Sequence, residues 1–129
     1  SLNHIMFGEI NAWLFKALGG IKPDPVQPGF KNIILQPHMP EGLSYFKAEH
    51  NGPSGNIVSG WRKESDHIVY EVTIPPNSTA TITLPGRLVK INNSEPTNVP
   101  YIKLLLPTSD GTRLQAGSGQ YTILLNLHD

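Results

Sequence analysis

The residues that could do acid–base or metal chemistry are scattered along this chain of 129 residues. The five histidines stand singly, and none shows the i, i+4 pairing or the Cys/His spacing of a metal site. They are His4, His38, His50, His67 and His128. The sequence has no cysteine, which excludes a thiolate nucleophile and a disulfide framework. We therefore expect no metal site and no cofactor.

The chain has ten acidic residues, so their number alone would permit a pair of carboxylates of the kind that glycosidases use. Seven of them fall in expected turns or on polar strand faces, and we interpret these as solvated surface charge. They are Glu41, Glu49, Glu64, Asp66, Glu71, Glu95 and Asp110. No serine lies in a nucleophile elbow, because Gly117-Ser118-Gly119 has a β-turn context. The sequence therefore predicts no catalytic residue within the chain.

Aromatic residues are the remaining candidates, because sugar-binding sandwiches offer exposed aromatic faces to pyranose rings. Trp61 shares a strand face with Ile57 and Ser59, which favours packing in the core. Tyr45 alternates with Phe46, so one of the two points outward, and tyrosine is the natural outward choice. A carbohydrate-binding module with its own sugar site needs two or more exposed aromatics that converge on one concave face. That module remains the alternative function.

Composition limits the kinds of partner. Lys plus Arg and Asp plus Glu number ten each, so the long-range field is weak and attracts neither nucleic acid nor anionic lipid. No apolar run approaches the roughly 20 residues that span a bilayer, so we expect no membrane insertion. The cellular compartment stays open, because many exported bacterial proteins also lack cysteine. The length fits one domain.

The first twenty residues differ from the rest. Apolar residues recur there at helical spacing of three and four, and they predict one α-helix from about Asn3 or His4 to Leu18, which the Gly19-Gly20 pair ends. These apolar residues are Leu2, Ile5, Met6, Phe7, Ile10, Trp13, Leu14, Phe15 and Leu18. A helix this apolar requires burial on most sides, which exceeds what one small sandwich offers.

Beyond this helix the pattern changes twice. Three prolines within residues 21–29 exclude a helix or a central strand and predict a stiff linker. From Phe30 onward, alternating polar and apolar residues between turn signals predict nine strands. They are Asn32–Gln36, Ser44–His50, Gly55–Lys63, His67–Ile74, Thr79–Leu84, Leu88–Ile91, Tyr101–Leu105, Arg113–Gly117 and Gln120–Leu127.

These patterns together predict the architecture. With no second helix for crossovers, we expect a mainly β fold, an antiparallel β-sandwich preceded by one N-terminal α-helix. The expected organisation is a helical segment over 1–20, a proline-rich linker over 21–29 and a β-sandwich domain over 30–129.

A series of short motifs resembles the C-terminal end of bacterial α-L-rhamnosidases of glycoside hydrolase family 78. The series begins with Ser-Leu-Asn-His-Ile-Met-Phe-Gly at 1–8, Ala-Trp-Leu-Phe at 12–15 and Leu-Gly-Gly-Ile-Lys-Pro-Asp at 18–24. It continues with Pro-Gly-Phe-Lys at 28–31, Ile-Leu-Gln-Pro-His at 34–38, Gly-Trp-Arg at 60–62, Pro-Pro-Asn-Ser-Thr-Ala at 75–80 and Gly-Ser-Gly-Gln-Tyr at 117–121. Each motif is unspecific alone, but together they cover nearly the whole chain.

The resemblance implies what surrounds the chain. In that family an (α/α)6 barrel hydrolyses terminal α-L-rhamnose with inversion, and both reactive carboxylates lie upstream of residue 1. Residues 1–20 are then the last barrel helix, and 30–129 the sandwich that supports the barrel. The implied partners are the upstream catalytic barrel of the same polypeptide and, for the full-length enzyme, a rhamnose-containing glycan.

The resemblance also gives His4 a role, because the histidine of the family's Asn-His-x-x-Phe-Gly motif faces the sugar pocket. A neutral imidazole offers a polyol one donor and one acceptor. Without the resemblance, capping or packing at the helix start would be favoured for His4.

Two expectations follow for the chain as an isolated fragment. It does not cleave α-L-rhamnosides, and its apolar helix favours a homodimer through residues 4–18, since each large apolar side chain buried contributes roughly 1.5–3 kcal/mol. An interaction domain unrelated to sugars is the third hypothesis.

Overall fold

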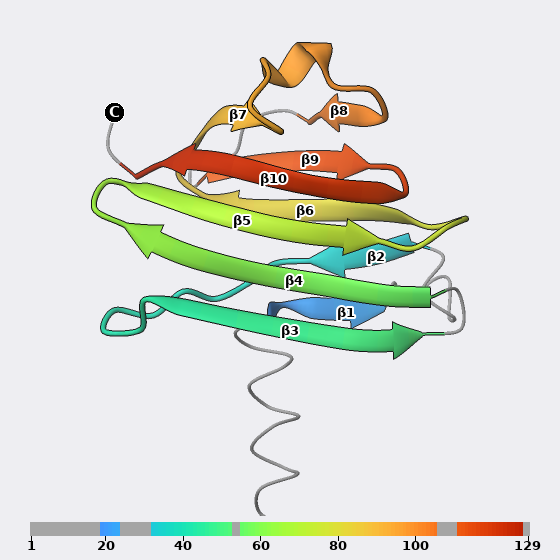
Figure 1. Cartoon of the computed structure of the whole chain (residues 1–129), viewed down its shortest axis with the longest axis horizontal. Coiled ribbons are helices and arrows are strands. Elements are labelled where there is room, and N and C mark those ends of the chain that lie inside the picture. Colours follow the sequence, from blue (N-terminus) through green and yellow to red (C-terminus); the bar gives the residue numbers. More distant parts are fainter. Residues whose placement is uncertain (1–18, 24–31, 53–54, 106–110, 128–129) are drawn as a thin grey trace, which may run out of the picture.

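The computed structural model describes residues 19–23, 32–52, 55–105 and 111–127, which form two five-stranded sheets packed face to face (Figure 1). The first sheet has the spatial order β1 (Ile21–Pro23), β2 (Asn32–Leu35), β6 (Thr79–Pro85), β9 (Gly111–Ala116), β8 (Ile102–Leu104). The second has the order β3 (Tyr45–Gly52), β4 (Gly55–Glu64), β5 (His67–Ile74), β10 (Gly119–Asn126), β7 (Arg87–Ile91). A short 3-10 helix, η2 (Pro96–Asn98), precedes β8. The predicted mainly β sandwich is confirmed.

Alternation along the strands builds the core between the sheets. Every second residue of β5 is buried, from Ile68 to Ile74, and the same holds for β6 from Ala80 to Leu84. The polar residues between them face outward, as the period of two requires. All nine predicted strands are present, with ends that differ by no more than two residues from the prediction.

The structure corrects the start of the predicted linker. Ile21–Pro23 form β1, which pairs antiparallel with β2 and buries Ile21 in the core. The prolines exclude only a central position, because a strand with a missing N–H can still lie at the edge of a sheet, and β1 is an edge strand. Residues 24–29 of the predicted linker lie outside the described residues.

The prediction of a purely antiparallel sandwich is wrong at one pair of strands. β2 and β6 are parallel, with Asn32 opposite Thr79 and Leu35 opposite Ile82. A parallel pair needs a long crossover, which is usually a helix. Here the chain between β2 and β6 forms three strands of the second sheet, β3, β4 and β5. This long connection serves as the crossover, so no helix is required.

The predicted N-terminal helix and His4 lie outside the described residues. Gly20, the second residue of the predicted helix stop, has a left-handed φ of 67°. Within the described part of the chain, no helix has the length and apolar character to cross a membrane.

Candidate functional site

The two aromatic residues singled out in the sequence lie on opposite faces of the second sheet. Trp61 is 3% exposed and packs in the core, whereas Tyr45 is 69% exposed, and both orientations were predicted. The register explains the difference, because Phe46 lies opposite Trp61 on the inner face and Tyr45 lies opposite Arg62 on the outer face. Trp61 and Tyr45 therefore do not converge on one sugar-binding face.

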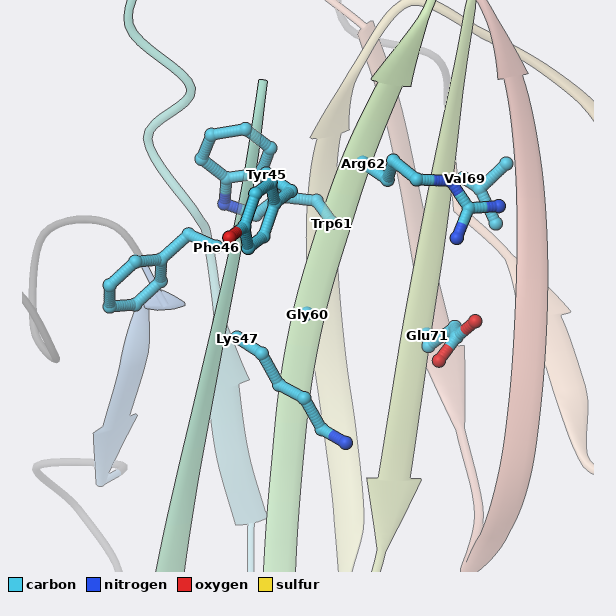
Figure 2. A pocket seen from close by; sticks show the side chains of 8 residues that line it. All are labelled: Tyr45, Phe46, Lys47, Gly60, Trp61, Arg62, Val69 and Glu71. Atoms are coloured by element: carbon cyan, nitrogen blue, oxygen red, sulfur yellow. The ribbon is translucent and has the colours of Figure 1, made fainter. Parts of the chain in front are cut away.

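The outer face of β3, β4 and β5 carries a hollow of about 160 Å³, shown in Figure 2. Besides Phe46 and Trp61, whose side chains face the core, two rows of outward positions line it. One row is Tyr45, Arg62 and Val69, and the next is Lys47, Gly60 and Glu71. We call this feature the Gly60 hollow.

Gly60 lies at the centre of the hollow and contributes no side chain to it. Lys47 and Glu71 flank Gly60 on the neighbouring strands, so their Cα atoms lie two strand spacings apart, roughly 10 Å. Figure 2 shows Gly60 between them, with the Tyr45 ring and the Arg62 guanidinium beyond. Gly60 itself is buried beside the stem of Lys47, so the β4 backbone underlies the hollow and the surrounding side chains form its rim.

A side chain added at position 60 would press mainly on one neighbour, Lys47. Gly60 has no positive φ, and an added Cβ would lie 3.2 Å from Cγ and 3.4 Å from Cβ of Lys47, a long exposed side chain that can shift. Gly20 differs, because its Cβ would overlap the backbone of Gln36 and its φ is left-handed. Glycine in a strand interior weakens the strand and often marks the close approach of a ligand or another backbone.

Charges of both signs surround the Gly60 hollow. Lys47 and Glu49 approach to 3.6 Å, and Arg62 Nε lies 2.7 Å from Glu64 Oε1. These pairs are more than half exposed, so each contributes little to stability. Glu71 is exposed and has no ion pair within the described residues. The mixed charges produce no strong field of one sign.

A second feature is buried directly behind this hollow. The Ser59 hydroxyl donates a hydrogen bond of 2.6 Å to the Gly19 carbonyl, and the Tyr70 hydroxyl lies 2.6 Å from Ser59 Oγ. Because the single proton of Ser59 is used by the carbonyl, Tyr70 is the donor in the second bond. Burial raises the pKa of Tyr70 well above its usual range, and the hydrogen bond with Ser59 offsets only part of that shift.

Residues 19 and 20 are held by both sheets. A Cβ on Gly19 would lie 2.5 Å from Ala48 Cβ of β3, and the Gln36 amide, just after β2, donates a 2.9 Å hydrogen bond to the Gly20 carbonyl. With the Ser59 bond, these contacts fix the main chain where it enters the sandwich. We call this set of contacts the 19–20 clamp. Sequence analysis missed it, and its only signal was a serine on the otherwise apolar face of Ile57 and Trp61.

Of the other sequence candidates, Glu71 lines the Gly60 hollow, and Glu49 and Glu64 pair with its lysine and arginine. The described carboxylates are all exposed, as interpreted from the sequence: Glu41, Glu49, Glu64, Asp66, Glu71 and Glu95. Asp110, His4 and His128 lie outside the described residues. Among the residues that the structure describes, no three His, Asp or Glu side chains gather into a metal-binding group.

Comparison with known proteins places these features in a family. The profile of the family described as Bacterial alpha-L-rhamnosidase C-terminal domain matches residues 20–98, more than half of the chain. The chain belongs to this family. The resemblance inferred from the motif series is thereby confirmed, and the match begins at the 19–20 clamp.

Relatives within this rhamnosidase family match nearly the whole chain. An alpha-L-rhamnosidase of Formosa agariphila is 32% identical over 124 residues, 94% of this chain and 13% of that protein. An alpha-L-rhamnosidase of Alteromonas sp. is 29% identical over 98% of this chain and 13% of its own length. The chain thus spans 13% of the length of these curated relatives.

Solved rhamnosidase structures share the fold. The structure of alpha-L-rhamnosidase from Dictyoglumus thermophilum has a TM-score of 0.79 at 27% identity, and the match covers 96% of this chain and 14% of that one. The alpha-L-rhamnosidase of Streptomyces avermitilis, crystallised with L-rhamnose, has a TM-score of 0.71 at 17% identity over 93% of this chain and 11% of that one. The second likeness shows the fold alone.

Proposed function

We propose that this chain is the C-terminal accessory β-sandwich of an α-L-rhamnosidase, which supports and docks onto an upstream catalytic barrel, and that the chain alone hydrolyses no rhamnoside. Family membership supports the first part, together with relatives named alpha-L-rhamnosidase that extend far beyond the matched region. The full-length enzyme would act on a rhamnose-containing glycan.

The observation that carries the support role is the 19–20 clamp. A flexible tether between two domains would leave its main chain exposed and hydrogen-bonded to water. Here Gly19 and Gly20 are buried, and the Gly19 carbonyl is bonded to Ser59 in the core. Such a connection fixes the direction in which the upstream chain leaves the sandwich, which a supporting domain requires.

The proposed inactivity rests on the described carboxylates. Hydrolysis of a glycoside needs two carboxyl groups that flank one bond, about 5 to 9.5 Å apart, one of which must hold a proton. Glu49 and Glu64 are exposed and paired with lysine or arginine on the same strand, and Glu71 is exposed on a different strand. A catalytic acid is normally enclosed in a cleft, whereas each of these three side chains is exposed to solvent.

An activity assay tests this proposal directly. The purified chain, incubated with an aryl α-L-rhamnoside, should release the aryl group no faster than buffer. The matched control is Glu71→Gln, which should leave the rate at the buffer value. Turnover by the unsubstituted chain that disappears in a Glu-to-Gln variant would contradict the assignment of the catalytic groups to the upstream region.

Two finer parts of the proposal concern residues outside the described ranges. We propose that His4 hydrogen-bonds a sugar hydroxyl in the full-length enzyme, so His4→Ala there should raise KM for rhamnosides.

We also propose that the isolated chain forms a homodimer through residues 4–18, which deletion of residues 1–20 should abolish in sedimentation equilibrium. A dimer that persists after the deletion would reject this contact.

A further inference from the structure

We propose that the Gly60 hollow binds one pyranose ring of a neutral glycan, with the apolar CH face of the sugar on Tyr45 and its hydroxyls on Glu71 and Arg62. This proposal is independent of the support role, since it concerns the outer face of the second sheet and not the clamp. It differs from the carbohydrate-binding module considered from the sequence, because this site has one exposed aromatic ring and not two.

Tyr45 supplies the apolar contact. Its ring is 69% exposed at the rim of the hollow, beside a floor that lacks a side chain. An isolated exposed tyrosine is ordinary surface. An exposed aromatic ring beside a concavity is different, because a ligand that fills the concavity contacts the ring face and the floor together.

Gly60 leaves the centre of the hollow without a side chain of its own. The strand would accept a side chain at this position if Lys47 shifted by a few tenths of an ångström, so the absence of a side chain is not explained by the fold. Glycine there also forgoes the packing that a β-branched residue would give on a strand. The arrangement is accounted for if a ligand approaches the backbone of β4.

The rim supplies donors and acceptors. Arg62 uses its Nε for Glu64, so its terminal amino groups remain to donate, and the Glu71 carboxylate has no ion pair in the described part of the chain. A carboxylate accepts hydrogen bonds at two oxygens, which suits a pair of adjacent hydroxyls. Lys47 and Arg62 supply donors and Glu71 supplies an acceptor at the hollow, so the hydroxyls of a neutral polyol can bond to both kinds of group, whereas Glu71 would repel an anionic ligand.

The proposed site is weak by construction. It has a single aromatic ring, and its rim side chains Tyr45, Arg62 and Glu71 are exposed, so much of the ligand stays hydrated. We expect a dissociation constant on the order of 1 to 10 mM for a monosaccharide glycoside. Such binding is too weak for detection on most arrays and is better followed by chemical-shift changes.

The experiment is an NMR titration of the full 129-residue chain. The probes are the methyl glycosides of L-rhamnose, D-glucose and D-galactose, with D-glucuronate as the charged counterpart. At least one neutral glycoside should produce saturable shifts confined to backbone amides of residues 45–47, 59–62 and 69–71. Tyr45→Ala and Gly60→Val should each weaken binding by about 10-fold or more, which corresponds to about 1.4 kcal/mol.

A matched variant makes the result specific. Tyr101 is 79% exposed and adjoins β8 of the other sheet, so Tyr101→Ala removes an equally exposed tyrosine away from the hollow and should leave binding unchanged. The proposal is overturned by the absence of shifts at the hollow with every neutral glycoside, by binding of D-glucuronate alone, or by equal effects of Tyr45→Ala and Tyr101→Ala. If the amide spectrum shows that one of these variants is unfolded, Glu71→Gln takes its place in the test. Glu71→Gln should weaken binding, and its amide resonances should stay as well dispersed as those of the parent chain.

Discussion

Ser59 and Gly60 are neighbours in β4, and they depart from the rules for a strand in opposite directions. Ser59 places a hydroxyl in the core, where apolar residues are expected, and Gly60 places no side chain on the outer face, where one would fit. The hydroxyl is satisfied by the main chain that enters the sandwich at Gly19. The glycine has no such partner within the fold. Departures from local rules tend to mark functional positions, and here only the inner one is explained by the chain itself.

The largest expected effect tests whether side chains on the inner face of the second sheet stabilise the fold while those on its outer face do not. Trp61→Ala should lower the free energy of unfolding by about 3–5 kcal/mol, because it leaves a cavity in the core. Tyr45→Ala, on the outer face one strand away, should change it by no more than about 0.5 kcal/mol. Urea unfolding of both variants gives the values. Equal losses would mean that Tyr45 also supports the fold.

Ser59 provides the next test. Ser59→Ala leaves both the Gly19 carbonyl and the Tyr70 hydroxyl without a partner, and each buried group left unsatisfied costs about 1–3 kcal/mol. Tyr70→Phe leaves the Ser59 to Gly19 bond intact, so its loss should be about 0.5–1.5 kcal/mol. The same unfolding measurement ranks the two. If Tyr70→Phe is the more damaging variant, the bond between the Tyr70 hydroxyl and Ser59 contributes more to stability than the bond between Ser59 and Gly19.

The buried hydroxyl of Tyr70, which bonds to Ser59 of the clamp, predicts that stability depends on pH. Burial raises the pKa of Tyr70 above its ordinary value of 10.0, while the unfolded chain ionises near that value. The contribution of this group to stability is therefore fully present below about pH 10, and the free energy of unfolding should fall by up to about 1.4 kcal/mol per pH unit as the pH rises further.

Thermal unfolding of the parent chain and of Tyr70→Phe, followed from about pH 9 to about pH 11, isolates this contribution. The variant should lose stability less steeply than the parent. It should still lose some, because burial and the nearby Tyr101 also raise the pKa of Tyr121. Identical slopes would show that Tyr70 can ionise without unfolding the core.

Sequence patterns predicted the strands well because a period of two is a local property. The alternation along His67–Ile74 and Thr79–Pro85 fixes which residues are buried, whatever the order of strands in the sheet. The parallel pairing of β2 with β6 and the edge strand β1 were missed, because they depend on contacts between distant segments. The motif series identified the family, which local pattern alone could not do.

The two site features differed in how far the sequence could predict them. The outward direction of Tyr45 followed from its alternation with Phe46, but the Gly60 hollow requires the register of three strands, which places Lys47 and Glu71 on either side of the glycine. The clamp joins Ser59 to Gly19 across 40 positions of sequence. No periodicity predicts a hydrogen bond over that separation.

The smallest expected effect concerns Gly60, and it is a gain in the free energy of unfolding, whereas the variants above lose stability. If no element of the fold needs glycine there, Gly60→Ala should raise the free energy of unfolding by about 0.5–1 kcal/mol, because alanine restricts the unfolded chain more than glycine does. Gly20→Ala is the contrasting variant and should destabilise the chain strongly, since its Cβ would overlap the Gln36 backbone and its φ is left-handed. Thermal unfolding measures both. A loss of stability in Gly60→Ala would mean that Lys47 cannot shift, that the glycine serves the sheet, and that the hollow is a by-product of packing.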